Sequence, residues 1–256
     1  MYRGQRFFLQ RNDLLTLQGA AMRLRTLTVI ALLLLPSPSP AAETAVLFRE
    51  DFATLDNWKP FSFPKIKSHS TYTIEREGGL HILRAESSAS ASAIVYRESF
   101  DVYEYPKARW RWKAKNIYAR GDARSKEGDD YPLRVYVMFE YAPDQAGAME
   151  RIKYGLIKAL YGEYPPHSSL SYVWASRVDA ETFVVSPYTD KAMMVLLEKG
   201  PARTGQWVDE EIDILADYQQ AFKTRPPARA RIAIMNDSDN TGESSVSWVQ
   251  YIEVFR

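Results

Sequence analysis

Beyond position 42 the chain alternates apolar and polar side chains over short stretches, which is the pattern of strands with one buried face. Turn-forming pairs such as Gly78-Gly79 and Pro165-Pro166 separate these stretches. The pattern predicts strands at 46–52, 71–75, 80–85, 93–100, 107–115, 133–141, 169–176, 183–185, 193–198, 207–215, 229–235 and 245–255. About a dozen short strands predict an all-β fold, a two-sheet antiparallel sandwich of the jelly-roll, concanavalin-like type.

One segment, DQAGAMERIKYGLIKALY at 144–161, has helical spacing instead. Asp144 can cap its start and Gly162 can end it. Its apolar stripe consists of Met149, Ile152, Leu156 and Leu160. The spacing predicts one inserted amphipathic helix, packed on the rim of a sheet. A mobile lid over a site and a helix lying on a membrane surface are the alternatives.

Two predicted strands carry arginines on their polar faces. In KARWRWKAK, Trp110 and Trp112 point to one side, which we expect to be the core, and Arg111 points to the other. In LRVYVMFEY, Arg134 and Tyr136 lie on the polar face. If these strands are neighbours, their polar faces form a surface that could hold a sugar chain with acidic groups. The alternative is an ordinary solvated face with cross-strand pairs.

The start of the chain has the composition of a secretory signal peptide. Arg23 and Arg25 are followed by an apolar run at 27–35 and by small residues up to Ala41. The run is shorter than a membrane-spanning helix, although a short anchor is an alternative. We therefore expect a periplasmic or secreted protein that has no stable membrane insertion once the signal is removed. The expected organisation is an over-extended N-terminus at 1–21, a signal peptide at 22–41 and a single β-sandwich domain at 42–256.

Composition narrows the functional classes. The chain has no cysteine, so disulfides, a thiol nucleophile and thiolate metal ligands are all excluded. Residues 1–41 contain five arginines and one aspartate, which leaves 28 basic and 31 acidic residues in the remainder. This slight negative balance gives no indication of a nucleic-acid partner.

Carboxylates and amides gather in two loops. Asp129 and Asp130 lie in SKEGDDYP, and Asp237, Asp239 and Asn240 lie in MNDSDNTGES. If the loops meet, these groups could hydrogen-bond sugar hydroxyls or bind calcium, the one cofactor that the sequence suggests. A helix-loop-helix calcium motif beginning at Asp237 is excluded, because a tryptophan occupies the position of its bidentate acid. An ordinary turn is the alternative.

Two aromatic residues in SLSYVWASR, Tyr172 and Trp174, are the predicted platform for a sugar ring. The predicted ligand-binding residues are Asp129, Asp130, Tyr131, Arg111, Arg134, Tyr172, Trp174, Asp237, Asp239 and Asn240, and Asp237 and Asp239 are also candidate metal ligands.

Signs of catalysis are weak. Residues 211–214, EIDI, resemble the nucleophile strand of laminarinase-like glycosidases, but Leu215 and Ala216 stand where the second glutamate is needed. Gly-x-Ser-x-Gly, His-Glu-x-x-His and phosphate-loop motifs are absent from the sequence, and its three histidines are scattered. No catalytic residue is predicted, and a binding protein is favoured over an enzyme.

Several stretches together resemble one family: LFREDFATLDNW, RWRWKAKN, KEGDDYPLRVYVMFEY, SPYT, GQWVDEEIDILADY and MNDSDNTGE. From about Val46 to its end, the chain is similar to the exported bacterial proteins of domain of unknown function 3047 (DUF3047). The resemblance implies a secreted single domain and no particular reaction.

The sequence leaves three functional hypotheses. The first is an exported β-sandwich that binds a carbohydrate or cell-envelope glycan. The second is a glycan-cleaving hydrolase or lyase on the same fold, and the third is an envelope assembly factor that binds a protein. Fold alone does not choose between them.

Overall fold

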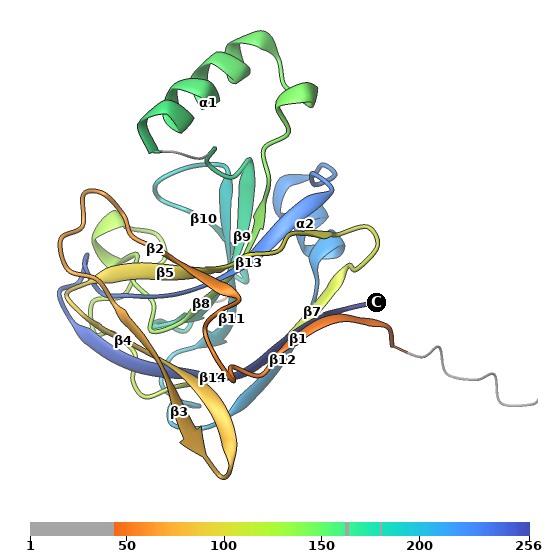
Figure 1. Cartoon of the computed structure of the whole chain (residues 1–256). Coiled ribbons are helices and arrows are strands. Elements are labelled where there is room, and N and C mark those ends of the chain that lie inside the picture. Colours follow the sequence, from red (N-terminus) through yellow and green to blue (C-terminus); the bar gives the residue numbers. More distant parts are fainter. Residues whose placement is uncertain (1–43, 162–163, 180) are drawn as a thin grey trace, which may run out of the picture. The chain divides into compact units, whose positions relative to one another are not determined.

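The alternating segments form strands in two sheets in the computed structural model, which describes residues 44–161, 164–179 and 181–256 (Figure 1). The strands are β1 (Val46–Glu50), β2 (Trp58–Phe61), β3 (Thr71–Glu77), β4 (Leu80–Ser88), β5 (Ala91–Tyr96), β6 (Phe100–Asp101), β7 (Lys107–Ala114), β8 (Arg134–Phe139), β9 (Ser168–Ala175), β10 (Phe183–Val185), β11 (Ala192–Lys199), β12 (Val208–Asp213), β13 (Arg229–Asp237) and β14 (Ser244–Phe255). The helices are α1 (Ala148–Tyr161) and α2 (Ile214–Phe222), with short 3-10 turns η1 (Lys126–Gly128) and η2 (Pro143–Gln145).

The strands pair in two orders. The six-stranded sheet runs β12-β7-β14-β4-β3, and β1 also pairs with β14. The eight-stranded sheet runs β10-β11-β9-β8-β13-β5-β2, and β6 also pairs with β13. The predicted two-sheet, jelly-roll sandwich is confirmed. One departure from an antiparallel arrangement is the parallel pairing of β9 with β11.

Aromatic rings from both sheets meet in the core. Trp110 and Trp112 of β7 lie 5.5 and 5.9 Å from the rings of Tyr172 and Trp174 of β9, measured between ring centroids. All four side chains are fully buried. Rings of this size each remove on the order of 150–250 Å² from water, so they contribute strongly to the contact between the sheets. The expected core position of Trp110 and Trp112 is confirmed.

Helix α1 forms within the predicted segment but begins at Ala148, because Asp144 lies in the preceding turn η2 and does not cap it, and it does not pack through the predicted stripe. Its buried contact among the described side chains is Tyr154, whose ring stacks on Tyr141 with the centroids 3.9 Å apart. The described stripe residues Met149, Ile152 and Leu156 are 80%, 60% and 64% exposed. The expectation that this stripe packs on a sheet is therefore wrong for these three residues.

Helix α2 was not expected from the sequence. The strand predicted at 207–215 ends at Asp213, whose Oδ1 accepts a hydrogen bond from the backbone N–H of Ala216 at 2.9 Å. An aspartate in this position caps a helix, and Ile214 and Tyr218 then bury one helical face. A cap side chain therefore ends the strand and begins the helix.

The predicted segments 1–21 and 22–41 lie outside the described residues. Residues Glu43–Arg256 form one compact unit. Among the described residues, every helix is too short or too polar to cross a lipid bilayer.

Candidate ligand-binding pocket

A pocket of about 450 Å³ lies on the eight-stranded sheet, on the face turned away from the core. On β8, the core residues Val135 and Val137 alternate with Arg134 and Tyr136, which line the pocket. Because successive side chains point to opposite faces of a strand, the pocket side chains lie on the outer face. The rest of the wall comes from the strands β9, β11 and β13 and from the loops, and consists of Phe63, Ile66, Asp129, Ser171, Ser186, Tyr188, Thr189, Ala192, Met194, Met235, Asp237, Asp239 and Asn240.

The loop before β8 reaches the pocket because of a tight turn at Gly128. Ser125 Oγ accepts a hydrogen bond from the Gly128 N–H at 3.1 Å, and the Gly128 carbonyl accepts one from Asp122 N–H at 2.8 Å. A Cβ on Gly128 would lie 2.6 Å from the Asp122 nitrogen, so only glycine fits here. This close approach places Asp129 and Asp130 at the end of the sheet where β8 begins.

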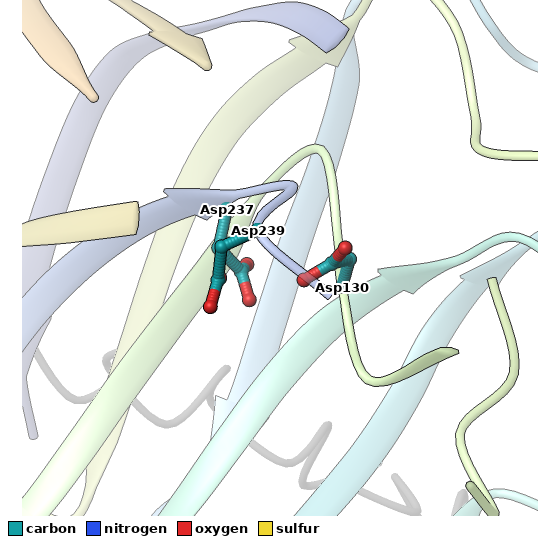
Figure 2. Close-up of side chains that lie close together, drawn as sticks. All are labelled: Asp130, Asp237 and Asp239. Carbon is teal, nitrogen blue, oxygen red and sulfur yellow. The ribbon is translucent and has the colours of Figure 1, made fainter. Parts of the chain in front are cut away.

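The two acidic loops meet at this end of the sheet, where β8 begins and β13 ends. Asp130 Oδ1 accepts a hydrogen bond from the backbone N–H of Asn240 at 3.3 Å, and Oδ2 accepts one from Thr241 N–H at 2.5 Å. Figure 2 shows Asp237 and Asp239 side by side, with the Asp130 carboxylate facing them. The sequence made a site here conditional on this meeting, and the structure brings the loops together.

Arg134 holds the acidic groups in place. Its Nε donates to Asp237 Oδ1 at 2.9 Å, and its Nη2 donates to Asp237 Oδ2 and to the Asp129 carbonyl. Its Nη1 lies 3.6 Å from Asp129 Oδ1. The guanidinium is almost fully buried and is paired with the carboxylates around it, so it is not available to bind an acidic group of a ligand.

Burial and mutual repulsion disfavour the charged forms of these acids. Burial raises the pKa of Asp237, with Asp130 and Asp129 adding to the rise, and the Arg134 guanidinium opposes it by pairing with the ionised form. Burial likewise raises the pKa values of Asp129 and Asp239. The local carboxylates thus outnumber the single guanidinium that neutralises them.

Two buried polar atoms on residues of the pocket wall lack a hydrogen bond within the described chain. Asp129 Oδ1 belongs to a residue that is 6% exposed. Ser171 Oγ, close to the Tyr136 hydroxyl, belongs to a residue that is 2% exposed. Each has a polar neighbour of its own, because Arg134 lies 3.6 Å from Asp129 Oδ1 and the Tyr136 hydroxyl lies beside Ser171, so these atoms belong to the interior of the pocket wall.

The exposed aromatic ring of the pocket is Tyr188, which is 54% exposed. Its hydroxyl accepts a hydrogen bond from Asn240 Nδ2 at 2.7 Å and donates one to the Lys126 carbonyl at 3.2 Å. Phe63 adds a second ring to the wall. The sequence analysis missed both residues, and the available signal was the SPYT turn, which places an aromatic residue after Ser-Pro.

The prediction that Tyr172 and Trp174 form a platform for a sugar ring is wrong. Tyr172 and Trp174 are fully buried between the sheets, where Trp174 Nε1 donates to the Gly200 carbonyl at 3.3 Å. Tyr131 is also buried, and Arg134 lies over its ring, 4.4 Å from the centroid. These three side chains cannot stack on a ligand.

The prediction that Arg111 and Arg134 lie on one shared surface is wrong as well. Arg111 lies on β7 of the six-stranded sheet, 3.6 Å from Asp209, whereas Arg134 belongs to the other sheet. The glycosidase-like acids also have other roles, because Asp213 caps α2 and Glu211 lies exposed on β12 opposite Arg109. Of the predicted set, five residues line the pocket: Asp129, Arg134, Asp237, Asp239 and Asn240.

Comparisons with known proteins identify a family and a type of fold. Residues 56–253 match the sequence profile of the family described as "Protein of unknown function (DUF3047)". No curated protein sequence matches this chain significantly. Similar solved structures include a family 11 carbohydrate-binding module from Clostridium thermocellum, with 13% identity, 82% of this chain and 94% of that chain covered, and a TM-score of 0.37.

Two further structures are similarly distant. The winged bean acidic lectin shares 9% identity over 82% of this chain and 98% of the lectin, with a TM-score of 0.35. Endoglucanase 3 of Trichoderma harzianum, from family GH12, shares 8% identity over 85% of this chain and all of that chain, with a TM-score of 0.36. Scores this low support no inference about ligand or reaction.

Proposed function

The chain belongs to the family described as "Protein of unknown function (DUF3047)", and we propose that it binds a carbohydrate or cell-envelope glycan in the pocket on the eight-stranded sheet. The observation that carries this proposal is the composition of the pocket wall, where the exposed ring of Tyr188 lies with the accessible polar side chains of Asp239 and Asn240. Sites for small molecules typically combine apolar surface with a few placed polar groups.

A sugar ring matches both halves of this wall. Its C–H face can stack on the half-exposed ring of Tyr188, while its hydroxyls can bond with the accessible side chains of Asp239 and Asn240 at the rim. A purely apolar ligand would cover these polar groups without pairing them, which makes it a poorer occupant.

The charge of the wall favours a neutral or amino-substituted glycan. Asp129, Asp237 and Asp239 line the pocket, and Arg134 is the one cation among its lining residues. Because Arg134 already pairs with Asp237, an acidic sugar would meet uncompensated repulsion. This reverses the expectation from sequence that arginines recognise acidic groups.

Export is part of the proposal. The basic, apolar and small-residue pattern of 22–41 supports delivery to the periplasm or the outside, and the absence of cysteine is compatible with an oxidising compartment. Cell fractionation, with mass measurement of the N-terminus, tests this. Recovery of the full-length chain in the cytoplasm would contradict it.

The binding proposal is tested by retention of the purified protein on immobilised polysaccharides and peptidoglycan. We expect retention on one glycan class and a loss of about tenfold in affinity for Tyr188→Ala, equivalent to about 1.4 kcal/mol. Tyr103→Ala is the matched control, because Tyr103 is 40% exposed and lies outside the pocket wall.

Other results would redirect the proposal. Equal affinities of the Tyr188→Ala and Tyr103→Ala variants would place glycan binding elsewhere. No retention on any glycan would reject the proposal and favour a protein partner in the envelope. Release of reducing ends from a retained glycan would show that the pocket carboxylates cleave it, which is the hydrolase alternative.

A further inference from the structure

We propose that the outer face of the six-stranded sheet is a second glycan-binding surface, which holds a neutral polysaccharide chain on the rings of Trp207, Trp248 and Tyr251. The ammonium of Lys113 contacts two of these rings, 4.4 Å from the centre of the Trp207 ring and 4.7 Å from that of Trp248. None of the four residues is among those that line the pocket on the eight-stranded sheet. This surface shares its class of ligand with the proposed function and rests on it in that respect, but the two sites belong to different sheets.

Strand pairing sets the two tryptophans on either side of Lys113. On β7, Lys113 alternates with the core residues Trp112 and Ala114, so its side chain points to the outer face. Trp248 of β14 is paired with Lys113, and Trp207 immediately precedes β12, on the other side of β7. Neighbouring strands lie about 4.7–4.9 Å apart, so rings separated by one strand stand about 9 Å apart. A single extended sugar chain can therefore contact both rings.

Trp207 and Trp248 are the accessible tryptophans of the chain. Both are half-buried, and all six tryptophans lie in the described residues. The other four are at most 2% exposed, namely Trp58, Trp110, Trp112 and Trp174. Tyr251, the third ring of the surface, is half-buried as well. Aromatic side chains left partly open on a sheet face are typical of binding surfaces, because they supply contact area at a low cost in conformational entropy.

The rings are held in place by charged side chains of the same face. Trp248 Nε1 donates to Glu75 Oε2 at 3.0 Å, while Lys113 lies over the ring. The guanidinium of Arg49 lies 4.1 Å from the centre of the Tyr251 ring. A cation over an aromatic face stabilises the position of the ring. Rings that are fixed before a ligand arrives lose little freedom when it binds, which favours binding.

The charges of this face are paired within it, which favours a neutral ligand. Lys113 lies 3.3 Å from Glu77, and Arg111 lies 3.6 Å from Asp209. The other arginines of the face are also paired: Arg84 with Glu75 and Glu86, and Arg49 and Arg109 with Glu253. A charged polymer would have to break such pairs, whereas the hydroxyls of a neutral sugar can bond with both members. A lipid or an apolar protein surface would bury the charged groups unpaired, which makes it a poorer occupant.

Acrylamide quenching of tryptophan fluorescence tests this surface separately from the pocket, because the described residues that line the pocket include no tryptophan. The protein is quenched with and without three soluble neutral polysaccharides: dextran, galactomannan and a β-glucan. We expect one of them to remove most of the acrylamide-accessible fluorescence, because it covers Trp207 and Trp248. Tyr188→Ala should show the same protection, because its change lies in the pocket.

Variants at the sheet edge assign the protection to the rings. Trp207→Ala is expected to weaken the affinity for the protecting polysaccharide at least about tenfold, measured by affinity electrophoresis. Trp207→Phe keeps an aromatic ring and should recover most of this loss. Tyr103→Ala is the matched control, because Tyr103 is 40% exposed and lies on neither surface, so it should bind like the parent protein.

Three results would overturn the proposal. The first is protection by none of the three polysaccharides, and the second is equal affinity of Trp207→Ala and Tyr103→Ala. The third is loss of protection in Tyr188→Ala, because the protein would then have one site, in the pocket. Protection that persists while Tyr188→Ala and Tyr103→Ala bind equally well would reject the pocket and retain this surface, so the two failures can be told apart.

Discussion

Arg134 and Asp237 form a buried, two-point ion pair between the adjacent strands β8 and β13, on the outer face of the eight-stranded sheet. Their side chains are only 6% and 2% exposed. Arg134→Met would leave the Asp237 carboxylate buried without its partner. We expect the free energy of unfolding to fall by about 3–5 kcal/mol, measured by urea denaturation at neutral pH.

A second ion pair on the same two strands provides the control. Arg231 of β13 donates to Glu140, which follows β8, at 2.8 Å, and the two side chains are 39% and 35% exposed. Solvent screens this pair, so Arg231→Met should cost about 0–1 kcal/mol. Similar losses for Arg134→Met and Arg231→Met would show that burial does not set the strength of the pocket pair.

Gly128 sets the path of the loop that carries Asp129 and Asp130. Gly128→Ala places a Cβ 2.6 Å from a backbone nitrogen, which cannot move as a side chain can. We expect a loss of about 1–3 kcal/mol in stability and weaker retention on glycan. Gly147→Ala, where a Cβ meets no atom within 4 Å, should change stability by less than about 1 kcal/mol. Urea unfolding of both variants tests this, and a neutral Gly128→Ala would contradict the close approach.

The carboxyl group of Glu210, on β12 of the six-stranded sheet, is expected to make the free energy of unfolding depend on pH. Burial raises the pKa of Glu210 to about 7, and the neighbouring carboxylate of Glu198 adds to the rise. Trp112 Nε1 donates to Glu210 Oε1 at 3.2 Å and opposes it. Between about pH 4.5 and 7 the folded state therefore holds a proton that the unfolded state has lost, so stability falls as pH rises through this window.

Glu210→Gln removes this titration and keeps an oxygen that can accept from Trp112. From pH 5 to pH 8, the free energy of unfolding of the variant should rise relative to that of the parent protein by on the order of 1–3 kcal/mol. Each unit of pKa shift corresponds to about 1.4 kcal/mol. Urea unfolding at both pH values measures the difference. Parallel pH profiles of the two proteins would show that Glu210 titrates normally.

Period-two alternation was enough to place the core face of β7, because Arg111 and its polar neighbours mark the other face. It failed on β9, where all eight residues from Ser168 to Ala175 are buried. One face of that strand packs in the core, and the loops around the pocket cover the other. Leu170, Tyr172 and Trp174 share the core face, and alternation alone does not show whether an aromatic face is buried or open to a ligand.

The sequence allowed the acidic residues of the pocket to be predicted, but it did not allow their arrangement in space to be predicted. Asp130 and Asp239 are more than a hundred positions apart, and their loops meet only because the β8–β13 pairing brings them to one edge. Tyr188 carries no local signal beyond its turn. The burial of Arg134 and its pairing with Asp237 are properties of packing, which no pattern along the chain records.

Helix α1 gives the last prediction, because its apolar stripe and its contact face differ. Tyr154 is 4% exposed, stacks on Tyr141 and accepts a hydrogen bond from Lys191 at 3.3 Å. Tyr154→Ala removes these contacts, so local opening of the helix should become more frequent. We expect trypsin to cleave at the exposed residues Lys153 and Lys158 about tenfold faster, since cleavage follows the open population.

Ile152→Ser is the matched variant on the other face of the same helix. Ile152 is 60% exposed, and isoleucine and serine have similar helix propensities, so cleavage and stability should change little. If Ile152→Ser instead opened the helix as strongly as Tyr154→Ala, the stripe would have to be covered in solution. Sedimentation of the parent protein and of Ile152→Ser would then show whether a second copy of the chain provides that cover.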